Sequence, residues 1–153
     1  MNLRSRLRIG VIGGNHPKPE FLKLAYDVGR LIGRNGAVLV CGGLGGVMEE
    51  AARGAKEAGG TTIGILPGSR TSDANPYIDF ALATGLGTTR NSLVAMNADV
   101  LIAVDGEYGT LSEIAFGRIY GKEVIGLGSW DIQGVTRAGT PEEAVELALK
   151  RRP

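Results

Sequence analysis

The sequence has few of the residues that carry most enzyme and metal chemistry. Its 153 residues include one cysteine, one histidine and one tryptophan, and only 5% are aromatic. The single Cys41 cannot form a disulfide within the chain, and one cysteine excludes a Cys-based zinc site. Because His16 is the only histidine, one chain can build neither a Ser/His/Asp triad nor a histidine-rich metal cluster. We therefore expect no metal site.

An excess of charge of one sign is also lacking. Seventeen Lys and Arg residues stand against 16 Asp and Glu residues, which gives a net charge of +1. This balance provides no general attraction to nucleic acid or to acidic membranes, so we expect neither as a partner. No apolar run approaches the ~20 residues of a membrane-spanning helix. The apolar part of residues 1–14 is too short for a signal peptide, so we expect a cytoplasmic protein.

Glycine, in contrast, is abundant. The chain has 25 glycines, well above the average share of about 7%. They are not spread as in a flexible linker but follow the ends of apolar runs, and no Ser-rich, Pro-rich or highly charged tract divides the chain. Length and composition predict a single domain over residues 1–153, large enough to bury a core.

Short apolar runs alternate with helical patterns along the whole chain. Alternation of this kind predicts an α/β protein, a three-layer α/β/α Rossmann-like fold with a mostly parallel sheet of about six or seven strands. The strand at 78–83 is the weakest, because an aspartate interrupts it. The expected strands are 7–12, 37–41, 61–66, 78–83, 100–104 and 123–127, and the expected helices lie at about 19–34, 48–58, 88–97, 110–120 and from 140 onward.

Four glycine turns follow strands in this pattern, at 13–14, 42–46, 85–87 and 106–109. In a parallel sheet every strand-to-helix turn emerges at the carboxyl edge, so we expect these turns to face one crevice near the switch in strand order. Helix N-termini at such turns attract phosphate. Tight turns and close helix–strand packing are the alternative reason for each glycine taken alone. The P-loop pattern is absent, and residues 43–48 (GLGGVM) resemble a dinucleotide fingerprint in which Met48 replaces the third glycine.

Two motifs carry a family resemblance. Residues 42–48 (GGLGGVM), together with Arg90 and residues 105–113 (DGEYGTLSE), resemble the GGGxxGLM and R…PGGxGTxxE motifs of the LOG family, which are cytokinin nucleoside-monophosphate phosphoribohydrolases often labelled lysine decarboxylase-like. Within that Rossmann-like superfamily, the small size and the segments 89–91 and 128–131 are most similar to the bacterial branch that includes the molybdenum cofactor carrier proteins. The resemblance runs from the first strand to the final helix.

The resemblance implies a phosphate site and, in an enzyme, a catalytic pair. Arg90 would bind phosphate or orient a ribose, and Glu113 would stabilise an oxocarbenium-like centre or activate water. No resident cofactor is required, and molybdenum cofactor or a nucleotide is a possible bound ligand. A homo-oligomer, dimer or tetramer, is also implied. The implied ligand-binding residues are Gly13, Gly14, Gly43, Gly45, Gly46, Met48, Gly87, Arg90, Asn91, Gly106, Tyr108, Gly109 and Thr110.

Three carboxylates depart from the family pattern. Asp105 replaces a proline, and Glu107 and Glu49 replace glycines, which adds negative charge near the expected phosphate site. Two functions therefore stay open: binding of a phosphorylated small molecule, with carrying of it as an extension, or LOG-like hydrolysis of a nucleoside monophosphate. A true lysine decarboxylase is not expected.

Arg90 and Glu113 can also be explained by structural roles alone. The structural alternative for Arg90 is that it only pairs with Glu113 or caps a turn. The spacing from Thr110 to Glu113 is that of a capping box, in which Thr110 is the N-cap of a helix and Glu113 closes the box.

Overall fold

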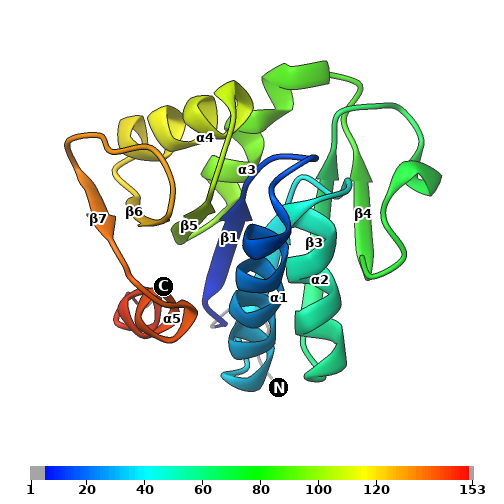
Figure 1. Cartoon of the computed structure of the whole chain (residues 1–153). Coiled ribbons are helices and arrows are strands. Elements are labelled where there is room, and N and C mark those ends of the chain that lie inside the picture. The colour runs from blue at the N-terminus through cyan, green and yellow to red at the C-terminus, as the bar shows by residue number, and fades with distance from the viewer. Residues whose placement is uncertain (1–5, 152–153) are drawn as a thin grey trace.

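The computed structural model describes residues 6–151, which form a seven-stranded, all-parallel sheet with helices on both faces (Figure 1). The strand order is β4-β3-β2-β1-β5-β6-β7. The elements are β1 (Arg8–Ile12), α1 (Pro19–Arg34), β2 (Val38–Cys41), α2 (Val47–Glu57), β3 (Thr61–Leu66), η2 (Thr71–Asp73), β4 (Phe80–Ala83), η3 (Gly87–Arg90), α3 (Asn91–Asn97), β5 (Val100–Val104), α4 (Tyr108–Ile119), β6 (Glu123–Leu127), β7 (Val135–Arg137) and α5 (Pro141–Leu149).

This architecture confirms the α/β Rossmann-like prediction. The chain adds β2, β3 and β4 outward on one side of β1, then returns to add β5, β6 and β7 on the other side. The carboxyl ends of β1 and β5, which pair directly from Ile9↔Val100 to Ile12↔Ala103, therefore mark the switch in strand order. Ligands of open α/β sheets bind in the crevice at this point.

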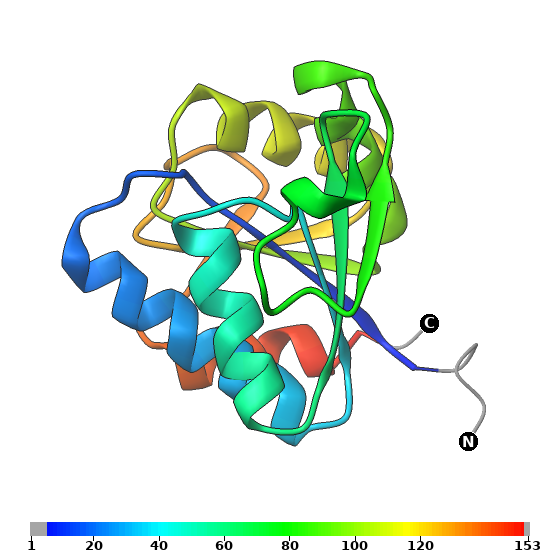
Figure 2. The ribbon, with the colours of Figure 1, turned by 90° about the vertical axis from the view of Figure 1, so that its right-hand side faces the viewer.

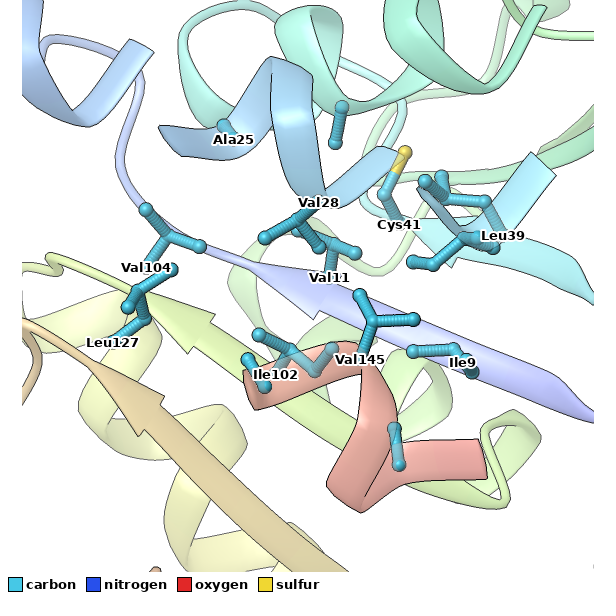
Figure 3. Packing of buried hydrophobic residues seen from close by; sticks show 14 of the residues in the cluster. Ile9, Val11, Ala25, Val28, Leu39, Cys41, Ile102, Val104, Leu127 and Val145 are labelled. Carbon is cyan, nitrogen blue, oxygen red and sulfur yellow. The ribbon is translucent and has the colours of Figure 1, made fainter. Parts of the chain in front are cut away.

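The core consists of two apolar layers, one on each face of the sheet. Helices α1, α2 and α5 cover one face and α3 and α4 the other (Figures 1 and 2). Figure 3 shows the first layer, in which Val28 of α1 and Val145 of α5 meet Val11 and Ile102 of the central strands. Strands β1, β2 and β5 contribute to both layers, which explains why their sequences are unbroken apolar runs.

Close packing of α1 against α2 accounts for part of the glycine content. A Cβ atom at Gly29 would lie 1.8 Å from the Ala51 carbonyl oxygen, and one at Gly54 would lie 2.1 Å from that of Tyr26. Any larger residue would force the two helices apart. Packing therefore requires glycine at both positions.

Element boundaries follow from local signals where such signals exist. Helix α1 spans 19–34, as predicted, with a proline in its first turn and Asn35 and Gly36 after its last residue. Helix α5 begins at the predicted Thr140 cap, whose hydroxyl accepts the Glu143 N–H at 3.1 Å. The third helix differs, because its first turn is the 3₁₀ segment η3. Strand β7, only three residues long, is not among the strands whose ranges were predicted.

No helix within residues 6–151 is both long and apolar enough to cross a membrane.

Candidate functional site

A cavity of about 200 Å³ lies at the carboxyl edge of the sheet, at the switch between β1 and β5. Its floor is the end of β1, and its walls come from the turn after β2, the η3–α3 junction and the start of α4. Residues more than 90 positions apart in sequence meet there because all these strands point the same way. The lining residues are Val11, Ile12, Gly13, Gly14, Asn15, Gly42, Leu44, Met48, Pro67, Thr88, Arg90, Asn91, Glu107, Gly109, Thr110 and Glu113.

Arg90 lies in the wall of this cavity and is held by the sheet. Its Nε donates to the Ile65 carbonyl oxygen at 2.7 Å and its Nη2 to that of Gly42 at 3.1 Å, while its Nη1 donates to the Asn91 side chain. The side chain is buried, and burial lowers the pKa of its guanidinium. Three of five guanidinium N–H groups have partners within residues 6–151, so two can serve a ligand.

Asn91 connects this arginine to the start of α4. Its amide nitrogen donates to Ser112 Oγ at 3.0 Å and more weakly to the Gly109 carbonyl oxygen at 3.4 Å. Asn91 itself is buried. The result is a continuous chain of hydrogen bonds from the ends of β2 and β3 to the N-terminal turn of α4, which fixes both cavity walls relative to each other.

Glu113 points into the cavity from the second turn of α4 and has the most perturbed ionisation in the site. The residue is 7% exposed, and its carboxyl has no hydrogen-bond partner within residues 6–151. Burial raises its pKa to about 8, against a smaller lowering effect of the nearby Arg90 charge. At neutral pH the carboxyl group is therefore mostly protonated and neutral, and it can donate as well as accept a hydrogen bond.

The capping-box reading of Thr110 and Glu113 is wrong. Helix α4 begins at Tyr108, three residues earlier than a Thr110 N-cap requires, and its N-cap is Glu107, which makes no side-chain capping bond. Thr110 lies inside the first turn and is buried. The second turn of the helix is held by ordinary backbone bonds, so Glu113 is left to the cavity.

The start of α4 supplies unpaired backbone donors. The first N–H groups of a helix have no partner within it, and they carry the positive end of the helix dipole. Leu111 N–H is the first to bond back, to the Glu107 carbonyl oxygen at 3.0 Å. Because Gly109 and Thr110 line the cavity, this positive end faces the same space as Arg90 and Glu113.

Of the three carboxylates that depart from the family pattern, only Glu107 lines this cavity. Its side chain lies beside Gly14, another lining residue, at 3.6 Å from where a Cβ atom there would be. Glu49 lines a separate groove with Asn15 and His16. Asp105 has a positive φ of 53°, the only such non-glycine residue within 6–151, and is not among the lining residues.

The structure brings about half of the predicted ligand-binding residues together. Those that line the cavity are Gly13, Gly14, Met48, Arg90, Asn91, Gly109 and Thr110, together with Glu113. Those that do not are Gly43, Gly45, Gly46, Gly87, Gly106 and Tyr108. The turn at 85–87 thus stops short of the cavity, and its neighbour Thr88 reaches it instead.

Gly46 shows why a glycine beside the cavity need not touch a ligand. Its φ is 63°, and a Cβ atom there would lie 2.3 Å from the Gly14 carbonyl oxygen. The next residue, Val47, donates its N–H to that same carbonyl at 3.0 Å. Gly46 therefore docks the start of α2 onto the turn after β1 and shapes the cavity from behind.

Eight lining residues were not in the predicted site set: Val11, Ile12, Asn15, Gly42, Leu44, Pro67, Thr88 and Glu107. Six of them lie at the end of β1 or in the turns after β1, β2 and β3. A position directly after a predicted strand was the signal that could have identified them. The prediction considered mainly the glycines in these turns and so left out their other residues.

Fold and cavity together define a Rossmann-like α/β protein with an anion-suited pocket at its topological switch point. The family model described as the SLOG cluster4 family matches residues 6–152, and the chain belongs to that family.

Known relatives cover nearly the whole chain. An uncharacterized protein of Archaeoglobus fulgidus is 45% identical over 145 residues, which is 94% of this chain and 95% of that protein. The structure of the molybdenum cofactor binding protein from Rippkaea orientalis has a TM-score of 0.90 at 40% identity, over 95% of this chain and 96% of the other. The Moco carrier protein from Chlamydomonas reinhardtii has a TM-score of 0.86 at 35% identity, over the same shares.

Proposed function

We propose that the switch-point cavity binds a phosphorylated small molecule, a molybdopterin-type cofactor or a nucleotide, and that the protein carries it. The observation that carries this proposal is Glu113, a carboxyl group that is buried, has no partner within residues 6–151 and faces a cavity next to Arg90 and the start of α4. A protonated carboxyl, two guanidinium N–H groups and free helix N–H groups are all donors. Phosphate oxygens are acceptors, so the set matches a phosphate group.

The raised pKa of Glu113 answers the objection that carboxylates repel phosphate. A group that titrates at about 8 is neutral at pH 7 and does not repel an anion. Glu107 is the remaining carboxylate in the lining. Its side chain lies beside Gly14, and in this proposal it faces the ring or sugar donors of the ligand rather than the phosphate.

The size of the cavity limits what it can enclose. About 200 Å³ is below the roughly 300–1,000 Å³ of pockets that bury a whole drug-sized ligand. The cavity therefore fits the phosphate end of a molybdopterin or nucleotide, and the ring system would lie across the rim. The two relatives whose structures are described as molybdenum cofactor binding and carrier proteins support a ligand of this kind. The net charge of +1 favours a small molecule over nucleic acid.

Purification under native conditions tests this function most broadly. The protein would be denatured after purification and the released small molecules identified by mass spectrometry. We expect a phosphorylated compound in a molar ratio near one per chain when it is expressed with its ligand available. Absence of any such compound, combined with no affinity for phosphorylated compounds added later, would contradict the proposal.

A nucleoside-monophosphate phosphoribohydrolase is the second candidate. Its specific support is that Arg90 and Glu113, the implied catalytic pair, do share one cavity. Release of free base from a set of nucleoside monophosphates, compared between wild type and Glu113→Gln, tests it. Release by the wild type that disappears in the glutamine variant would establish this activity, and no release from any compound would exclude it in favour of binding.

We further propose that the protein is a homo-oligomer, in which a second copy covers the exposed part of the sheet. Phe80 and Leu82 of β4 pair in register with Ile63 and Ile65, so they point to the face that carries α3 and α4. Both are more than half exposed, as α3 packs against β1 and β2 rather than over β4. Parallel sheets are normally covered on both faces, and an apolar, uncharged face suits an identical copy. Light scattering should give at least twice 16.0 kDa, and Leu82→Glu should reduce it to the monomer mass.

A further inference from the structure

Tyr108 and Trp130 form an aromatic pair beside the cavity, and the proposed phosphate site does not use it. Their ring centroids are 6.0 Å apart at an interplanar angle of 29°, which is a stacked arrangement. Tyr108 is nevertheless 80% exposed. One face of its ring is thus supported by Trp130, and the other is open to solvent.

The pair is fixed relative to the cavity through Glu107. The Trp130 indole N–H donates to the Glu107 backbone carbonyl oxygen at 3.2 Å, and the Glu107 side chain lines the cavity. Tyr108 lies between Glu107 and Gly109, both of which are lining residues. Trp130 comes from the segment after β6, the strand next to β5, so the pair extends the carboxyl edge beyond the cavity.

Exposure of the Tyr108 ring to water is unfavourable, and the packing of the ring against Trp130 does not explain why it is exposed. Large apolar side chains are usually buried, and the ring gains only one partner here. Rings left open at a binding edge are the common means by which proteins hold planar heterocycles, since every such heterocycle has a π-face. A ligand whose phosphate occupies the cavity must also extend past the rim, because the cavity is too small for the rest.

We propose that Tyr108, supported from behind by Trp130, is the stacking surface for a planar bicyclic ring, pterin or purine, of the phosphorylated ligand. This inference rests on the proposed function, because it takes the phosphate to lie against Gly109 and Thr110. The ring then covers the open face of Tyr108 and passes the Glu107 carboxylate, which can accept from a ring amino group. In this proposal Tyr108, which was predicted from the sequence to bind the ligand, does so from outside the cavity rather than from its lining.

Calorimetric titration of the full chain tests the stacking role. The probes are ribose 5-phosphate, which has a phosphate but no ring, guanosine 5′-monophosphate and a pterin monophosphate. The wild type should bind one or both ring-bearing compounds more tightly than ribose 5-phosphate, and the tighter of the two identifies the ring. Tyr108→Ala should weaken the affinity for that compound about tenfold or more, while the affinity for ribose 5-phosphate should change less than about twofold. Tyr108→Phe should keep wild-type affinity, and so should Ile119→Ala, which changes another exposed apolar residue of α4.

Four outcomes would overturn this role, and they separate it from the phosphate site. If Tyr108→Ala leaves the affinity for ring-bearing compounds unchanged, or weakens ribose 5-phosphate equally, the ring does not stack there, although phosphate binding stands. If the wild type binds ring-bearing compounds no more tightly than ribose 5-phosphate, stacking is also refuted. If the wild type binds none of the three, the phosphate site itself is refuted and the stacking role with it.

Discussion

The Arg90 guanidinium and the Glu113 carboxyl line the same cavity, but no ion pair joins them within residues 6–151. Arg90 instead donates to the carbonyl oxygens of Ile65 and Gly42 and to Asn91. The two side chains feel each other's charge, as the opposite shifts they cause show: the arginine lowers the pKa of the glutamate, and the glutamate raises that of the arginine. Burial outweighs both effects. The pair is therefore open to a third group, such as the proposed phosphate.

The pH dependence of stability should report the buried Glu113. Its pKa is about 8 in the folded chain against an ordinary value of 4.5, so from about pH 4.5 to 8 the unfolded chain binds fewer protons than the folded one. The free energy of unfolding of the wild type should fall across that range, by an amount on the order of a few kcal/mol, and level off above it. Glu113→Gln has no such proton to lose. Urea unfolding at pH 5, 7 and 9 should show that the free energy of unfolding of the variant, relative to that of the wild type, increases as the pH rises.

Glu146→Gln is the matched control for that experiment, because it removes an exposed carboxyl from another helix. Its stability relative to the wild type should change little between pH 5 and 9. A constant difference in the free energy of unfolding between Glu113→Gln and the wild type over this range would mean that Glu113 is ionised in the folded protein. An ionised Glu113 would repel a phosphate group, which would contradict the proposed site.

Arg90→Lys should weaken both the fold and the ligand site. A lysine ammonium carries its three N–H donors on one nitrogen, so it cannot reach the Ile65 carbonyl, the Gly42 carbonyl and Asn91, which the guanidinium meets with three separate nitrogens. We expect a loss of about 1–3 kcal/mol in the free energy of unfolding, from buried acceptors left without partners, together with weaker binding of phosphorylated compounds. Arg70→Lys, at an exposed ion pair with Asp73, should change neither. Unchanged stability of Arg90→Lys would show that the sheet does not depend on these bonds.

The sequence predicted element boundaries correctly where a local signal sets them, and it failed where contacts between distant segments set them. The proline and the Asn35–Gly36 stop fixed α1, and Thr140 fixed the start of α5, because each signal acts within a few residues. The same T-x-x-E spacing misled at α4. There the helix starts at Tyr108, and Glu113 is turned into a cavity formed by distant strands, which no local pattern reveals.

The site shows the same division. The family resemblance implied Arg90, Asn91 and Thr110, all of which line the cavity, but it does not say that Arg90 is held by Ile65 of β3 and by Gly42 just after β2. The glycines at 43–46 were read together, whereas each has its own surroundings in the fold. Strand β7 is short and half exposed, so its sequence has too little apolar pattern to predict it.

Adjacent glycines in the turn before α2 should respond differently to alanine. At Gly46 the backbone is left-handed and a Cβ atom would collide with the Gly14 carbonyl oxygen, so Gly46→Ala should cost more than about 1 kcal/mol of stability. At Gly45 the nearest atom is Asn15 Oδ1 at 3.7 Å, an ordinary contact, so Gly45→Ala should stay near wild type. Thermal unfolding of both variants gives the comparison. Equal melting temperatures would show that the turn adapts freely.

The cap of α5 should behave as a local stabilising unit independent of the site. Thr140 accepts the Glu143 N–H, and the Glu143 carboxylate in turn accepts the Gly139 N–H at 2.8 Å. Thr140→Ala should cost about 0.5–2 kcal/mol, whereas Thr140→Ser should keep most of the stability. Urea unfolding measures both. A serine variant as unstable as the alanine variant would mean that the hydroxyl bond contributes nothing.

The central claim, that a phosphate group lies against the start of α4, is tested most directly by a carboxylate placed there. The Cβ atom of residue 109 would have only Asn91 Nδ2 nearby, at 3.6 Å, so Gly109→Asp puts a negative group into the cavity at a helix end that tolerates it. Calorimetric titration with a pterin monophosphate and nucleoside monophosphates would compare this variant with the wild type and with Lys18→Asp, which places the same group at the N-cap of α1. We expect saturable binding of at least one of these compounds, one per chain, by the wild type and Lys18→Asp, and at least a tenfold loss of affinity in Gly109→Asp at an unchanged melting temperature. Equal affinity in all three proteins, or no binding by the wild type, would contradict the account.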